Sequence, residues 1–180
     1  MYFYIETERL FIRPINLNDT EFMLELLNSE GWLKYIGNSK ISSLVAAQDY
    51  IQRIHDNPSY FYSVFELKSE GDSELKPMGI ITYLKRDKLE YPDIGFAIKP
   101  EFENMGFTFE ACKSYLTKIL ELPNYNQDII NVIGITIPDN IRSVKLLEKL
   151  GLKFAFNYED KDEVLACYSL ESIENKKHHS

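Results

Sequence analysis

The chain has 180 residues, a length typical of one domain and long enough to bury a core without disulfides or metals. Its 28 acidic and 20 basic residues give a formal charge of −8. That charge disfavours direct nucleic-acid binding, because nucleic-acid-binding domains usually carry a basic surface. No stretch reaches the roughly 18 consecutive apolar residues of a membrane-spanning helix. The first residues lack the basic region and apolar run of a signal peptide, so we expect a cytoplasmic protein with no membrane partner.

Two cysteines cannot form a dense disulfide framework. Cys112 and Cys167 lie in stretches with helix-like and strand-like patterns, and we expect two reduced, buried thiols. The chain has no CxxC pair, and only His55 falls inside the expected fold, so we expect no metal site. We expect one domain over residues 1–172, followed by a disordered polar tail at 173–180.

Hydrophobic periodicity in the first half of the chain predicts a strand, two helices and then three strands. Aromatic and β-branched residues favour a single first strand, which Pro14 would end because proline cannot donate to a strand ladder. The polar turn at 69–74 joins two later strands as a hairpin. The expected elements are a strand at 3–13, a helix beginning near Asn18, a helix from Ser42 or Ser43 to about His55, and strands at 60–68, 77–86 and 93–98.

Strands and helices alternate in the second half. Apolar residues three and four apart indicate a helix over about 107–120. Residues 129–137 are almost wholly apolar, as in a strand covered on both faces. Gly151 is well placed to end another helix before closing strands at 152–157 and 162–170. This order predicts an α/β fold with a mixed central sheet of about seven strands, flanked by helices on both faces.

The loop with Gly106, between the strand at 93–98 and the helix at 107–120, is a candidate phosphate site. Backbone N–H groups at a helix N-terminus are unsatisfied and carry the positive end of the dipole, so they can hold a phosphate. Gly106 would let the backbone approach a ligand closely. A single glycine before a helix also serves as a simple turn, and the loop alone leaves both interpretations open.

Asn140 and Ser143 form a second candidate site. They are three residues apart and therefore lie on one face of a helix. Taken by itself, this spacing is also that of a helix cap at Asn140 or Asp139, followed by an exposed polar position.

In this order after three strands, the two segments resemble the GNAT N-acetyltransferase family. The opening Glu8–Pro14 (ERLFIRP) resembles the start of its RimJ/RimL-like branch, as do Met78–Ile81 and Asp93–Phe96. The resemblance covers roughly residues 5–170 and implies the single-domain GNAT fold. Motifs of P-loop NTPases, serine hydrolases and zinc proteases (GxxxxGK[ST], GxSxG, HExxH) are absent from the sequence.

The resemblance implies acetyl-CoA as co-substrate. In this family a splayed strand, here residues 94–98, offers backbone groups to the pantetheine arm. The diphosphate loop, usually [QR]-x-x-G-x-[GA], would be residues 103–108, and an N-x-x-S helix lies near the thiol. The residues that would contact acetyl-CoA are Phe96, Ala97, Ile98, Asn104, Met105, Gly106, Phe107, Thr108, Asn140 and Ser143.

Three positions depart from the family pattern. Glu103 replaces a basic or amide residue, and its carboxylate would repel a diphosphate unless it points outward. Thr108 replaces a smaller residue and adds bulk. Leu147 stands where many members have a tyrosine that protonates the departing thiolate. These departures keep open an alternative function, a non-catalytic or weakened CoA-binding regulatory module on the same fold.

The resemblance implies direct transfer, in which an amine attacks the thioester carbonyl. A backbone N–H of residues 94–98 would stabilise the oxyanion. With no tyrosine at position 147, Ser143 or a water it holds is the candidate proton donor. Asp93, at the start of that strand, is the candidate general base; otherwise it is a surface carboxylate in a turn.

The acceptor is expected to be a small-molecule or peptide amine. Members of the RimJ/RimL-like branch often act on protein α-amino groups, including those of ribosomal proteins. Trp32, Tyr35 and Tyr83 are candidates for the acceptor pocket, with core packing as the alternative role for each. Transfer of a different acyl group is a further alternative, and we expect a monomer or a homodimer.

Overall fold

A computed structural model describes residues 3–38, 40–68, 75–122, 131–160 and 163–170. The predicted turn at 69–74 and the predicted tail at 173–180 lie outside these residues. So do the first two residues of the strand predicted at 129–137.

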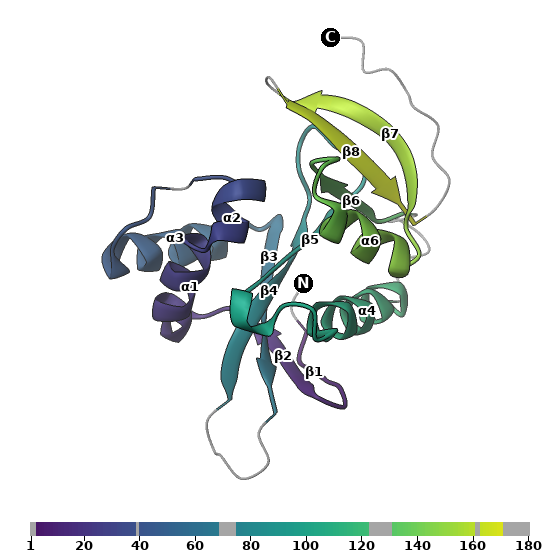
Figure 1. Ribbon diagram of the computed structural model, residues 1–180. Coiled ribbons are helices and arrows are strands. Elements are labelled where there is room, and N and C mark those ends of the chain that lie inside the picture. Colours follow the sequence, from purple (N-terminus) through teal and green to yellow (C-terminus); the bar gives the residue numbers. More distant parts are fainter. Residues whose placement is uncertain (1–2, 39, 69–74, 123–130, 161–162, 171–180) are drawn as a thin grey trace.

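One mixed β-sheet forms the centre of the fold (Figure 1). Its eight strands run in the order β1-β2-β3-β4-β5-β6-β8-β7, and all neighbouring pairs are antiparallel except β5 and β6. This confirms the predicted α/β class and mixed sheet, with one strand more than the expected seven. The strands are β1 (Ile5–Glu6), β2 (Leu10–Pro14), β3 (Tyr60–Leu67), β4 (Lys76–Leu84), β5 (Asp93–Ile98), β6 (Ile133–Thr136), β7 (Lys153–Asp160) and β8 (Glu163–Ser169).

The extra strand arises because the predicted single strand at 3–13 was wrong. The chain turns between β1 and β2, which pair with each other as an antiparallel hairpin. Thr7 closes this turn, because its backbone N–H donates to the Leu10 carbonyl at 2.9 Å while its hydroxyl accepts from the Leu10 N–H at 2.9 Å. Pro14 is the last residue of β2, as predicted.

Local capping signals define the helices. Ser43 caps α3 by accepting from the Ala46 N–H, and Ser29 caps α2, a short helix that is not among the predicted elements. Gly151 follows the last helix with a φ of +97°, the left-handed conformation that glycine adopts without strain. The helices are α1 (Thr20–Leu27), α2 (Glu30–Tyr35), α3 (Leu44–Asp56), α4 (Phe107–Leu120) and α6 (Ile141–Lys149), with short 3-10 helices η1 (Leu17–Asp19) and η2 (Pro100–Phe102).

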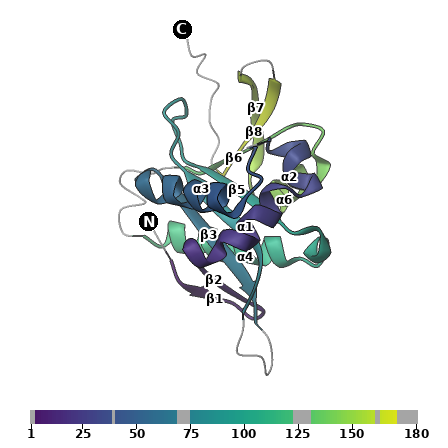
Figure 2. The ribbon, with the colours of Figure 1, turned by 90° about the vertical axis from the view of Figure 1, so that its left-hand side faces the viewer.

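Helices cover both faces of the sheet, as predicted (Figures 1 and 2). Helices α1 to α3 pack on one face, where Ile80 and Leu84 of β4 join their buried cluster. Helix α4 packs on the other face, where Ile81 and Tyr83 of the same strand contribute. This alternation follows from the two-residue period of a strand and fixes which β4 side chains can reach a given site. None of the described helices combines the length and apolarity needed to cross a membrane.

Candidate active site

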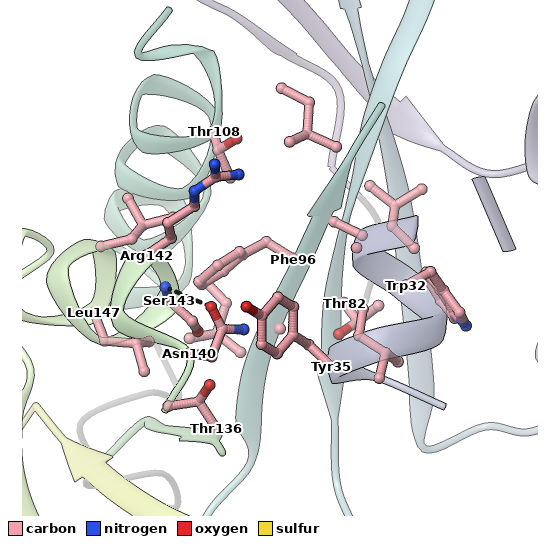
Figure 3. Close-up of a pocket in the computed structure, with 18 of the residues that line it drawn as sticks. Trp32, Tyr35, Thr82, Phe96, Thr108, Thr136, Asn140, Arg142, Ser143 and Leu147 are labelled. Atoms are coloured by element: carbon pink, nitrogen blue, oxygen red, sulfur yellow. Dashed lines mark hydrogen bonds between the residues drawn. The ribbon is translucent and has the colours of Figure 1, made fainter. Parts of the chain in front are cut away.

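A cavity of about 1130 Å³ opens where β5 and β6 separate. The two parallel strands are paired at Asp93 and Ile133. Beyond that point β5 continues along β4, and β6 pairs with β8. The walls of the cavity come from β4, β5, β6, α2 and α6, together with the loop that leads into α4 (Figure 3).

Strand β5 forms part of the cavity wall, and one edge of its backbone faces the cavity. Phe96, Ala97 and Ile98, which the family resemblance assigns to the pantetheine arm, all line the cavity. Their partners on β4 satisfy the opposite edge of β5. A strand edge without a neighbouring strand presents a row of backbone N–H and C=O groups, which can bind the amides of an extended ligand.

The start of α4 forms the second part of the site. Gly106 is the N-cap, with a φ of +80°, and it provides no side chain to cap the first amides of the helix. Asn104, Gly106 and Thr108 line the cavity. The other two predicted contact residues of this loop do not: Met105 is exposed, and Phe107 is buried in the core beneath α4.

Arg9 fixes this loop from outside the cavity. Its Nη1 donates to the Met105 carbonyl at 3.1 Å, and its guanidinium lies 4.5 Å from the centre of the Phe107 ring. Glu110 holds the same arginine through a 2.7 Å ion pair. These contacts hold the loop in the conformation that leaves the first amides of α4 uncapped.

Helix α6 brings Asn140 and Ser143 to the cavity. Asn140 is the N-cap, and its Oδ1 accepts from the Ser143 N–H at 3.2 Å. The capping role and a place in the cavity therefore coincide in Asn140. Leu147 lies one turn further along, is buried, and closes the wall with an apolar side chain.

The structure contradicts the alternative interpretation of Asp93 as a surface carboxylate in a turn. Asp93 is only 3 % exposed and lines the cavity beside Arg86. Arg86 Nε donates to one carboxylate oxygen at 2.8 Å, and Nη2 donates to the other at 3.2 Å. Burial raises the pKa of Asp93 above its ordinary value, and the arginine offsets part of that rise.

The predicted aromatic residues separate into two groups. Trp32 and Tyr35 of α2 line the cavity, and Figure 3 shows the Tyr35 ring projecting into it. Tyr83 does not line it, because its strand neighbours Thr82 and Leu84 face the cavity while Tyr83 points to the α4 side. Thr82, Thr136 and Arg86 also reach the cavity, and no motif in the sequence distinguished them.

Comparison with known proteins identifies the family. A family model described as an acetyltransferase (GNAT) domain matches residues 9–153. The chain belongs to the GNAT acetyltransferase family. The uncharacterized N-acetyltransferase YnaD of Bacillus subtilis is 25% identical over 150 residues, which cover 83% of this chain and 82% of YnaD.

Two solved acetyltransferase structures show the same fold with ligands bound. The ribosomal L7/L12 alpha-N-protein acetyltransferase RimL, in complex with coenzyme A, has a TM-score of 0.74 and 11% identity, over 94% of this chain and 97% of that one. The microcin C7 self-immunity acetyltransferase MccE, in complex with acetyl-CoA and AMP, has a TM-score of 0.73 and 14% identity, over 93% and 94%.

The GNAT cavity of this chain fits a long, phosphate-bearing thioester. Uncapped amides at the start of α4 suit the diphosphate, and the free edge of β5 suits the pantetheine amides. Glu103, the carboxylate expected to repel a diphosphate unless it points outward, forms an ion pair with Arg142 of α6. Both side chains line the cavity.

Proposed function

We propose that this chain transfers the acetyl group of acetyl-CoA to a primary amine. The observation that carries the proposal is one cavity in which the free edge of β5, the uncapped start of α4 and the Asn140–Ser143 pair meet. Acetyl-CoA supplies the activated acyl group as a thioester. Gly106 and Thr108 hold the diphosphate end, and the backbone of Phe96, Ala97 and Ile98 holds the pantetheine arm.

Groups around the thioester end then carry the transfer. The amine nitrogen bonds to the acetyl carbonyl carbon, and the carbon–sulfur bond breaks. A backbone N–H of β5 stabilises the negative charge on the carbonyl oxygen. Asp93 takes the proton that the amine loses, through a water, and Ser143 or a water it holds protonates the thiolate. Trp32 and Tyr35 form a wall against which the acceptor packs.

For the acceptor, we propose a protein α-amino group, as in the RimJ/RimL-like branch, with a small amine as the alternative. The ERLFIRP opening and the shared fold with RimL support that branch. The net charge of −8 also favours a basic amino-terminal segment over an acidic one.

A thiol-release assay tests the proposal. We expect free coenzyme A to appear from acetyl-CoA only when an amine is added, first with a panel of small amines and then with basic amino-terminal peptides. Titration calorimetry with acetyl-CoA runs beside it. Binding without amine-dependent release would instead support the non-catalytic module, and no binding at millimolar acetyl-CoA would contradict both functions.

Asp93→Asn tests the base. We expect a loss of about a hundredfold or more in kcat/KM, within the usual contribution of general base catalysis. Asp93 acts only when ionised, so the native rate falls as pH drops through its pKa. Because burial raises that pKa, the fall begins above the ordinary aspartate range, and the variant should lose this acidic limb. The measurement is a pH profile of kcat/KM.

Glu163→Gln provides the matched control for the base, since Glu163 is another carboxylate on the cavity wall, exposed and outside the proposed chemistry. It should keep the native profile. Unchanged turnover across pH in Asp93→Asn would remove Asp93 from the mechanism.

A further inference from the structure

The ion pair between Glu103 and Arg142 joins two walls of the cavity. Glu103 follows η2 in the loop that leads to α4, whereas Arg142 is the second residue of α6. Arg142 Nη1 donates to Glu103 Oε2, and both residues line the cavity. Glu103 is half-buried, but Arg142 is 71 % exposed. The arginine is therefore the partner with freedom to move.

Two further cations lie on the same helix as Arg142. Lys145 and Lys149 follow Arg142 at helical spacing and also line the cavity, so one face of α6 is basic. The Lys149 ammonium lies 4.1 Å from the centre of the Phe109 ring on α4. Figure 3 shows Arg142 projecting toward the end of the cavity where Thr108 lies. The other lining carboxylates are Asp93, held by Arg86, and Glu163 on β8.

The Arg142 guanidinium could bind either the Glu103 carboxylate or a phosphate. Arginine binds carboxylates and phosphates with the same planar, bidentate geometry. An ion pair between an exposed arginine and a carboxylate contributes little free energy, because water screens the two charges. A phosphate at the uncapped start of α4 brings more charge and a better-defined position. Exchange of Glu103 for a phosphate oxygen is therefore favourable once a diphosphate enters.

We propose that Arg142 changes partners when coenzyme A binds: it leaves Glu103 and binds the diphosphate, so that Glu103 acts as a built-in competitor that lowers affinity for the coenzyme. The proposal rests on the proposed function only in that the cavity must bind coenzyme A. It explains how a carboxylate is accommodated at position 103, where the family pattern has a basic or amide residue. Arg142 supplies from α6 the positive charge that this loop lacks.

A double-mutant cycle on binding distinguishes exchange from a pair that stays intact. If the pair persists in the complex, each charge acts on the phosphates separately, and the effects of removing Glu103 and Arg142 add. If Arg142 leaves Glu103, binding to the native protein includes the loss of that pair. Removing Arg142 then costs more affinity when Glu103 is already absent.

Titration calorimetry with coenzyme A measures the four proteins of the cycle: native, Glu103→Gln, Arg142→Gln and the double variant. We expect Glu103→Gln to tighten binding about two- to fivefold, the value of an exposed ion pair. Arg142→Gln should weaken it about tenfold in the Glu103→Gln background, as for a lost charged hydrogen bond, and about two- to fivefold less in the native background.

Two controls localise the effect. Pantetheine, which has no phosphate, should bind all four proteins equally. Replacing the exposed Lys118–Glu121 pair at the C-terminal end of α4 with two glutamines should leave coenzyme A affinity unchanged, since neither residue lines the cavity.

An additive cycle, or equal coenzyme A affinity in all four proteins, would overturn the exchange while leaving amine-dependent acetyl transfer intact. Failure of the native protein to bind coenzyme A would instead contradict the proposed function together with this inference. The two failures are thus separable in one set of titrations.

Discussion

Replacing Arg13 with methionine is expected to lower the free energy of unfolding by about 3–5 kcal/mol. The Arg13 guanidinium donates to Asp19 at 2.7 and 2.8 Å and to Glu66 at 2.6 and 3.2 Å. Asp19 is 2 % exposed and Glu66 is 3 % exposed. Methionine fills the space of the arginine stem but leaves two buried carboxylates without their cation. Urea unfolding followed by circular dichroism measures the loss.

The effect is large because a buried charge that loses its partner is left without water or a counter-charge to stabilise it. Hydrogen bonding to Asp19 and then to Glu66 raises the pKa of Arg13, so the network stabilises its charged form. An exposed pair lacks this dependence, and Lys118→Met, which breaks the pair with Glu121, should cost less than about 1 kcal/mol. Adding Asp19→Asn and Glu66→Gln to Arg13→Met should recover part of the stability. A loss below 1 kcal/mol for Arg13→Met alone would contradict this account.

Elements with strong local signals could be predicted from the sequence. Helix α4 begins and ends where predicted, because an apolar stripe runs between Gly106 and a polar end. The turn between β1 and β2 could not, since Thr7–Arg9 contains no glycine or proline and continues an otherwise strand-like segment. The turn depends on hydrogen bonds to Thr7 and on the ion pair between Arg9 and Glu110, about a hundred residues away.

The candidate site shows the same division. Gly106, Asn140 and Ser143 line the cavity. They could be selected from the sequence because the start of a helix has a local sequence signal. Tyr83 was misplaced because alternation shows that it faces away from Thr82 but does not show which face borders the cavity. Such contacts depend on tertiary placement, which the sequence pattern alone does not contain.

The charged partners in the cavity were a second gap. The sequence does not indicate which residue pairs with Glu103, since Arg142 lies 39 positions away in α6. Arg86 gave as little sign of its bond to Asp93, because a strand end with one basic residue is common on any protein surface. The sequence therefore predicted that Glu103 would repel a diphosphate unless it pointed outward, and it did not indicate that Arg142 pairs with it.

Replacing Gly106 with valine is expected to weaken coenzyme A binding about a hundredfold or more, as measured by titration calorimetry. Gly106 has a φ of +80°, where a β-branched residue is strained, and relief of that strain would move the first amides of α4. Loss of two charged hydrogen bonds to the diphosphate accounts for that magnitude. The added Cβ itself would meet no clash, because its nearest neighbour is Arg9 Nη2 at 3.6 Å.

Gly151→Val separates the loss of the site from general strain. Gly151 also has a positive φ, and a Cβ there would lie 3.9 Å from Leu170, so the substitution carries the same kind of backbone strain. It does not line the cavity. Both variants should therefore lose about 1–3 kcal/mol of stability, but only Gly106→Val should lose affinity. Native coenzyme A affinity in Gly106→Val would mean that the diphosphate is held by the basic face of α6 and not by the amides of α4.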